Sequence, residues 1–313
     1  MNLFNLLGLT MVAVAGLVVS AELLAVPPRL MWGWGPGLSG YCGEASLQSA
    51  GLFFGNYISQ EQVRYAGGNT EVLIDVNLHK AADTLGFTYD RWKVVSKVGY
   101  HRAELDSFPI WTKNHLDSGH PVIVGVYESK PLRSADPDYD HIVPIIGYDT
   151  LNLALYYNDL YCPTTRTLGL KDIKTRVACT QTAEPSQPYP YCFPATNNYG
   201  IAIMGVKGTS SCQLSLDIGD WSEPDWGEED KLHQKPITFY PKITAKGLIP
   251  GNKYSVVRFD SVDSLPEDDF LRGSWSELIE FVSENEEEVV RGKDIQSDGT
   301  YFYRCVKLRS NYD

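Results

Sequence analysis

Four residues have the types and the order along the chain that thiol catalysis requires. Cys42 ends an irregular segment and opens a stretch of small residues, His141 opens a strand-forming stretch, and Asn158 and Asp159 close the next one. A thiol becomes a nucleophile where a helix N-terminus and an imidazole favour its thiolate form, and a third polar group orients the imidazole. We therefore expect Cys42 as nucleophile, His141 as general base, and Asp159 or Asn158 as orienting residue.

The elements that must position these residues follow from the spacing of apolar side chains. We predict helices over residues 43–55, 58–66, 72–85 and 108–119, and strands over residues 87–92, 121–127, 141–148, 153–157 and 199–206. The turn at residues 149–152 makes the third and fourth of these strands a hairpin. Neighbouring strands place opposite side chains next to each other, so His141 is expected beside the Asn158 and Asp159 pair.

Four sequence strings resemble those of papain-like cysteine peptidases. They are residues 41–46 (YCGEAS), 119–126 (GHPVIVGV), 141–149 (HIVPIIGYD) and 155–159 (LYYND). Their order looks closest to the branch typified by the double-glycine peptidases, which process bacteriocin leaders. The resemblance covers residues 30–206. It implies an α+β, papain-like fold with an N-terminal helix packed on an antiparallel sheet, and a hydrolase that cleaves peptide or amide bonds of a peptide or protein substrate through an acyl-enzyme on Cys42.

The resemblance leaves two assignments for the orienting residue. Asp159 matches the family's Asn-Asp-Pro ending, with Leu160 in place of proline, whereas Asn158 matches the asparagine of papain itself. We favour Asp159.

The chain departs from the family at the oxyanion hole. The family has a glutamine six residues before the cysteine, where this chain has Pro36, so Ser39 or Trp34 is the candidate for a second donor beside the Cys42 N–H. One lost donor costs about 10²–10³ in rate. A second function therefore stays open, a catalytically weakened or inactive papain-like protein acting as a secreted binding module, and acyl transfer is a third.

The N-terminus is typical of a signal peptide. Residues 6–21 are apolar and uncharged and end in Val19-Ser20-Ala21, so we expect a signal peptide over residues 1–21. An uncleaved anchor is the alternative, but Glu22 interrupts the apolar run before it reaches about 18 residues. We expect no stable membrane span and a protein that is secreted or lies in the lumen of the secretory or endolysosomal pathway.

Composition excludes one class of partner. The 313 residues include 27 Lys and Arg against 39 Asp and Glu, a formal net charge of −12, and no Lys/Arg-rich block. Such a chain is a poor ligand for a phosphate backbone, so we expect no nucleic-acid partner. The length suits two domains. The sequence says nothing about oligomeric state.

The C-terminal third has a different character. It is more acidic, and its short strands separated by turn residues predict an all-β sandwich. Residues 247–256 (GLIPGNKYSV) are similar to the turn into a strand of fibronectin type III domains. We therefore predict a papain-like domain over residues 22–208 and an acidic fibronectin type III-like domain over residues 209–313.

With one of the six cysteines assigned to catalysis, an odd number remains for disulfide pairing. Of six, Cys42 is assigned to catalysis, and we expect disulfides between Cys179 and Cys192 and between Cys212 and Cys305. One loop cysteine then stays free. Apart from His141, the histidines show no spacing typical of a zinc site, so we expect neither a metal nor a cofactor; they are His79, His101, His115, His120 and His233.

Overall fold

The computed structural model describes residues 23–31, 40–92, 102–127, 139–161, 164–170, 191, 193–194, 197–208, 210–219, 237–266 and 270–308. The predicted signal peptide lies outside the described residues, as do Trp34, Pro36, Ser39 and the expected Cys179–Cys192 pair.

A six-stranded antiparallel sheet forms the centre of the N-terminal part. Its order is β2 (Phe87–Arg91), β7 (Gly200–Val206), β3 (Val122–Val126), β4 (His141–Asp149), β5 (Ala154–Asn158) and β6 (Thr165–Gly169). The strands predicted from their β-branched runs form, with ends within about two residues of those expected. The hairpin β4–β5 turns where expected, because the Asp149 carboxylate accepts the backbone N–H groups of Leu151 and Asn152. Strand β6 was not predicted.

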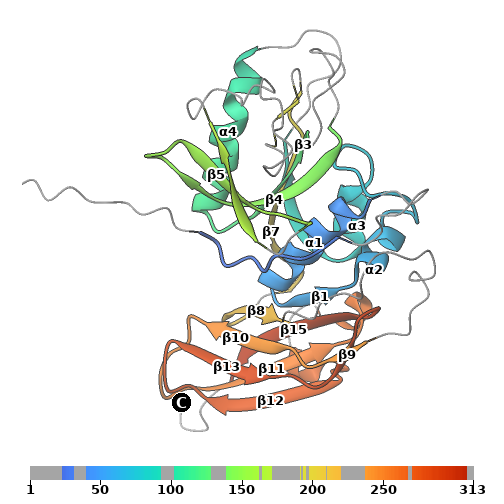
Figure 1. The fold of residues 1–313 in the computed structure, drawn as a ribbon. Coiled ribbons are helices and arrows are strands. Elements are labelled where there is room, and N and C mark those ends of the chain that lie inside the picture. Colours follow the sequence, from blue (N-terminus) through green and yellow to red (C-terminus); the bar gives the residue numbers. More distant parts are fainter. Residues whose placement is uncertain are drawn as a thin grey trace, which may run out of the picture.

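Helices cover both faces of this sheet (Figure 1). The helix α4 (Arg102–Asp117) lies on one face, and α1 (Cys42–Phe53) lies on the other with α2 (Gln60–Ala66) and α3 (Leu78–Thr84) beside it. Strand β3 shows why both faces are apolar: Ile123 packs in the core under α1, whereas Val122 and Val124 pack in the core with α4 residues. The core therefore has two halves, one on each side of the sheet.

Two helices differ from the sequence-based expectation. The third helix begins at Leu78 rather than near residue 72, because the buried Asn77 side chain holds the preceding turn: it accepts the N–H of Leu73 and donates to the carbonyls of Gly67 and Glu71. The fourth helix begins at Arg102, six residues earlier than expected, and keeps Pro109 inside it.

The described strands of the C-terminal part lie in three smaller sheets. The first contains β1 (Asn56–Ile58), β15 (Thr300–Lys307), β11 (Lys253–Phe259) and β12 (Glu277–Val282); the second contains β13 (Glu287–Arg291), β10 (Lys242–Lys246) and β8 (Gln213–Asp217); the third pairs β14 (Ile295–Gln296) with β9 (Thr238–Phe239). The short 3₁₀ helices η2 (Val262–Ser264) and η3 (Phe270–Arg272) lie between β11 and β12 in the chain. The molecule is thus a mixed fold of helices and several antiparallel sheets.

Strand β1 joins the two parts, although it comes from the N-terminal third of the chain. It pairs with β15 in the register Asn56 with Phe302 and Ile58 with Thr300. The fully buried Arg304 donates to the Asn56 side chain and to the carbonyl of Lys207. Figure 1 accordingly shows α1 between the large sheet and the C-terminal strands. The predicted domain boundary at residue 208 falls within this region of contact and stays a prediction.

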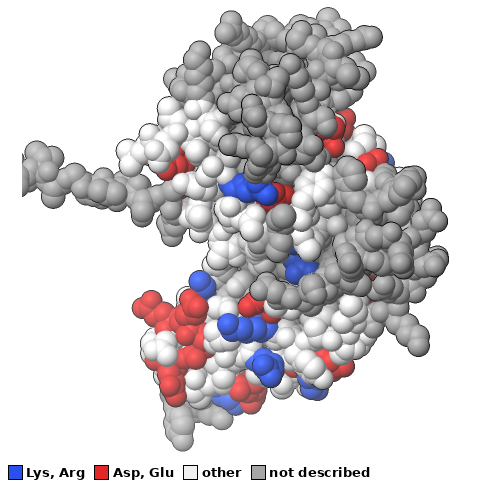
Figure 2. All heavy atoms as spheres, in the orientation of Figure 1, with Lys and Arg blue, Asp and Glu red and all other residues white. Residues whose placement is uncertain are grey.

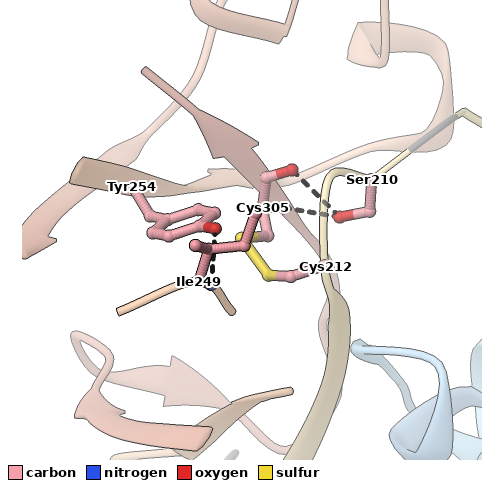
Figure 3. Close-up of a disulfide and its surroundings, with 5 residues drawn as sticks. All are labelled: Ser210, Cys212, Ile249, Tyr254 and Cys305. Atoms are coloured by element: carbon pink, nitrogen blue, oxygen red, sulfur yellow. Dashed lines mark hydrogen bonds between the residues drawn. A yellow bond between two sulfur atoms is a disulfide. The ribbon is translucent and has the colours of Figure 1, made fainter. Parts of the chain in front are cut away.

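A disulfide joins Cys212 to Cys305, the pairing expected from the sequence (Figure 3). The hydroxyl of Ser210 donates to the Cys305 carbonyl and accepts the Cys305 N–H, which fixes the chain entering β8 against β15. Beside the bridge, the Tyr254 hydroxyl accepts the N–H of Ile249 at 3.0 Å, five residues upstream.

Most charged side chains of the C-terminal strands lie at the surface, whereas Arg258, Glu277 and Arg304 are buried. Figure 2 shows Asp and Glu gathered at one end of β10 and β13, with Lys and Arg mixed with further Asp and Glu over the rest of that face. Exposed ion pairs such as Lys246–Glu287 and Lys253–Glu280 belong to this surface, and exposed pairs of this kind contribute little to stability. Among the described helices, none is long and apolar enough to cross a membrane.

Candidate active site

Cys42 is the first residue of α1 and keeps a free thiol. The side chain is 9% exposed. The following residue has to be glycine, because a Cβ on Gly43 would lie 2.1 Å from the carbonyl oxygen of Val72. The close approach of residue 72 to the helix start therefore explains the glycine at position 43 by packing alone.

The surroundings of the thiol keep it protonated. Burial, reinforced by the Glu44 carboxylate, raises the pKa of Cys42 to about 12, and hydrogen bonds from the backbone of Ile142 and Gly43 oppose this only in part. The bond from Ile142 brings the sulfur beside the start of β4, because Ile142 directly follows His141. Although a helix N-terminus favours an anion, desolvation dominates here.

A buried ion pair secures the segment that leads into Cys42. Arg64 on α2 donates through Nε to Glu44 Oε1 at 2.7 Å and through Nη2 to the carbonyl of Gly40 at 2.9 Å. Its guanidinium carbon lies 3.4 Å from the centre of the Tyr41 ring. Burial raises the pKa of Glu44 to about 7, against the opposing effect of Arg64. Sequence reasoning missed this pair, because nothing local links two residues twenty positions apart.

His141 is the first residue of β4 and is only 2% exposed. Its ring stacks on Tyr161, with centroids 5.2 Å apart and planes 14° apart, and it also contacts the Tyr191 ring at 5.2 Å. The Nε2 atom is buried and has no hydrogen-bond partner among the described residues. Burial lowers the pKa of His141 to about 3, so the imidazole is neutral at physiological pH.

Asn158 and Asp159 lie buried at the end of β5, with their side chains bonded to groups other than His141. The Asn158 amide donates to the carbonyl of Val26 at 2.8 Å and accepts from the Thr165 hydroxyl at 3.2 Å.

The Asp159 carboxylate forms an ion pair with Arg166 and accepts the N–H of Tyr161 at 2.9 Å. Within the described part of the chain, no hydrogen bond joins either side chain to the His141 ring. Asp159 thus touches the residue that stacks on His141.

The Cys42 thiol and the His141 imidazole are both buried and both uncharged at physiological pH. The structure brings the sulfur to the backbone beside His141 and packs the imidazole between two tyrosine rings. With a thiol pKa of about 12 and an imidazole pKa of about 3, no preformed thiolate–imidazolium pair is present, and attack by the sulfur requires its proton to leave as the new bond forms. No cluster of three or more metal-ligating side chains occurs among the described residues.

Residues 23–176 match the model of the Peptidase_C39 like family. This match relates the N-terminal part of the chain to the C39 peptidases and supports a peptidase-like function at the family level. It includes Cys42, His141, Asn158 and Asp159, and it ends before β7 and the C-terminal strands. No curated protein and no solved structure matches the chain.

Proposed function

We propose that the protein is a cysteine peptidase-like hydrolase that cleaves peptide or amide bonds, with Cys42 as nucleophile and His141 as general base. The observation that carries the proposal is the free thiol at the first position of α1, held beside the start of β4 within the segment that matches the C39-like family.

In the proposed reaction, the Cys42 sulfur attacks the carbonyl carbon of the substrate while its proton passes to His141. The imidazolium then gives that proton to the departing amine, which leaves an acyl-enzyme. Water hydrolyses the thioester, with His141 taking a proton from the water and returning it to the sulfur. The Cys42 N–H is the proposed donor to the oxyanion, with Ser39 as the second candidate.

We infer that Asp159 orients His141 through Tyr161. The Asp159 carboxylate holds the backbone of Tyr161, and the Tyr161 ring stacks on the imidazole. Replacing Asp159 by Asn keeps an acceptor for the Tyr161 N–H, whereas Ala removes it. We expect Asp159→Ala to lower kcat with little change in KM and Asp159→Asn to restore much of the loss. A direct bond from Asp159 to the imidazole would instead make both variants equally poor.

The second candidate is a binding module without chemistry. The uncharged thiol and imidazole and the proline at position 36 favour it, because a weak oxyanion hole and a protonated thiol both slow acyl transfer. Such a protein would still bind peptides and would bind them equally well after loss of the thiol.

A peptide library incubated with the mature protein separates these functions. We expect new N-termini, detected by mass spectrometry, that vanish in Cys42→Ala and His141→Ala. His79→Ala, which removes a histidine from α3, is the matched control and keeps the cleavage. Cleavage that survives Cys42→Ala would refute the peptidase, and saturable peptide binding without cleavage would establish the binding module.

We further propose that the protein is secreted and that residues 209–313 form a fibronectin type III-like sandwich. The Cys212–Cys305 disulfide suits an oxidising compartment. The bond from Ile249 to the Tyr254 hydroxyl is similar to the tyrosine corner of immunoglobulin-like sandwiches. N-terminal sequencing of secreted protein should begin at Glu22; a protein that starts at Met1 and stays with the cells would contradict the predicted cleavage.

The pairing of β1 with β15 also gives the C-terminal strands a role, which is to support the predicted catalytic helix at its C-terminal end, where α1 leads into β1. We expect a chain truncated after residue 208 to lose the cooperative unfolding of the full chain, because truncation exposes apolar side chains of α1 and β1 such as Leu52 and Tyr57. A truncated chain that unfolds cooperatively and with unchanged stability would show that the C-terminal strands are dispensable.

A further inference from the structure

We propose that His115 and His120 form a binding site for a divalent transition-metal ion such as Zn²⁺, with Asp90 as the outer carboxylate that orients His115. Their Nδ1 atoms lie 3.3 Å apart. Two imidazole nitrogens bound to one tetrahedral Zn²⁺ at 2.0–2.1 Å lie about 3.3 Å from each other, so the pair has the separation of two zinc ligands.

The end of α4 brings the two rings together. Gly119 has φ +78°, its N–H bonds to the carbonyl of Leu116, and the N–H of His120 bonds to the carbonyl of His115. These two bonds form the Schellman motif, which brings the residue two positions past the helix end against a residue of the last turn. Usually that contact is between two apolar side chains, and here it is between two imidazoles.

The tautomer of His115 leaves the correct nitrogen for the metal. Its Nε2 lies 3.2 Å from Asp90 Oδ2, and an ionised carboxylate only accepts hydrogen bonds, so Nε2 carries the proton. The Nδ1 atom therefore presents its lone pair towards His120. Carboxylate, imidazole and metal in this order make the outer-sphere arrangement common to protein zinc sites.

The surroundings keep this geometry in place. The Trp111 indole N–H donates to Asp90 Oδ2 at 3.1 Å, and the Trp111 ring packs edge-on against His115 with centroids 4.7 Å apart. Both imidazoles are only partly buried, which leaves room for water to complete the coordination. No described carboxylate or thiol supplies a third protein ligand, so the site is one of two histidines.

This site is separate from the candidate active site. His120 lies just before the start of β3, and the other end of β3, Val126, pairs with His141. A strand of five residues separates the two places by about 13 Å. Metal binding and peptide cleavage can therefore be tested independently.

Calorimetric titration of the mature protein with Zn²⁺ tests the proposal. We expect one Zn²⁺ per chain, with binding lost in His120→Gln and in His115→Gln. Asp90→Asn should weaken binding by about 10- to 100-fold, as the loss of an outer carboxylate does. His79→Ala and Cys42→Ser, which remove other potential ligands, should leave it unchanged.

Cu²⁺ serves as a spectroscopic probe of the same site, and its electron paramagnetic resonance spectrum should show coupling to two nitrogens that falls to one in His120→Gln. Near-ultraviolet circular dichroism checks that each variant is folded. The proposal is overturned if folded wild-type protein shows no saturable Zn²⁺ binding, or if His120→Gln binds Zn²⁺ as tightly as the wild type.

Discussion

His141 and Glu44 should change the stability of the protein with pH in opposite directions. Burial lowers the pKa of His141 from 6.5 to about 3, so the unfolded chain binds a proton that the folded chain does not. The stability from this neutral ring is full above pH 6.5 and is lost as the pH falls towards 3. Burial raises the pKa of Glu44 from 4.5 to about 7, so its contribution is full below pH 4.5 and is lost as the pH rises through 7.

The two effects have similar size. A difference of one bound proton between folded and unfolded states is worth about 1.4 kcal/mol per pH unit. From pH 7.5 to pH 4.5, protonation of His141 in the unfolded chain lowers the free energy of unfolding by about 3 kcal/mol, and Glu44 raises it by about 3 kcal/mol. In the wild type these two contributions to the free energy of unfolding nearly cancel. A substitution that removes one group leaves the pH dependence of the other measurable.

Urea unfolding of the wild type and four variants at pH 7.5 and pH 4.5 measures this cancellation. Relative to the wild type, His141→Phe should become about 3 kcal/mol more stable on acidification and Glu44→Gln about 3 kcal/mol less stable, while the double variant keeps the wild-type pH dependence. Glu287→Gln, which removes an exposed carboxylate, serves as the control and should change little.

The test uses the difference in the free energy of unfolding between pH 7.5 and pH 4.5. Each substitution also changes packing, but that change is the same at both pH values and drops out of the difference. If His141→Phe had the wild-type pH dependence, the imidazole would not be a desolvated neutral group, and the description of a buried, uncharged His141 would be wrong. His141→Gln gives the same answer should phenylalanine not fit between the tyrosine rings.

Three further predictions concern the cysteines and the helix start. The pKa of Cys42 is near 12 in the folded protein, so its thiol should react with iodoacetamide about 10³-fold more slowly at pH 7 than in the urea-unfolded chain. Mass spectrometry measures the two rates. Rapid labelling of the folded protein at pH 6 would contradict a protonated thiol. Gly43→Ala should lower the free energy of unfolding by about 3 kcal/mol or more because its Cβ meets a backbone carbonyl, whereas Gly40→Ala, with open space around it, should be nearly neutral in the same urea titration. Replacing Cys212 and Cys305 by Ala should cost about 4–5 kcal/mol in the chain-entropy model, and an unfolding midpoint that does not move would contradict this.

The sequence predicted those parts of the fold that depend on neighbouring residues. The start of α1 at Cys42 and the β4–β5 hairpin both follow from local composition, namely the small residues after Cys42 and the turn at residues 149–152. These signals act within a few positions of the chain. They therefore identified the segments that carry Cys42 and His141.

Contacts between distant segments had no such signal. The sequence predicted no strand at residues 56–58, because a three-residue strand has no recognisable period and forms only on the edge supplied by β15. The Glu44–Arg64 pair and the tyrosines around His141 likewise arise from the packing of separate elements. The histidine pair at the end of α4 is a mixed case, since a glycine before His120 marks the helix end but only the folded turn brings His115 against it.

The sequence by itself determined which residues can do thiol chemistry and on which elements they stand, because residue type and local periodicity are properties of the chain. Only the tertiary structure decided the protonation states and hydrogen-bond partners of these residues. Burial sets the charge of Cys42 and His141, and burial depends on which segments pack over them. The sequence would assign a thiolate beside an orienting Asp159, whereas the folded protein has a protonated thiol, a neutral imidazole and a carboxylate that binds Arg166.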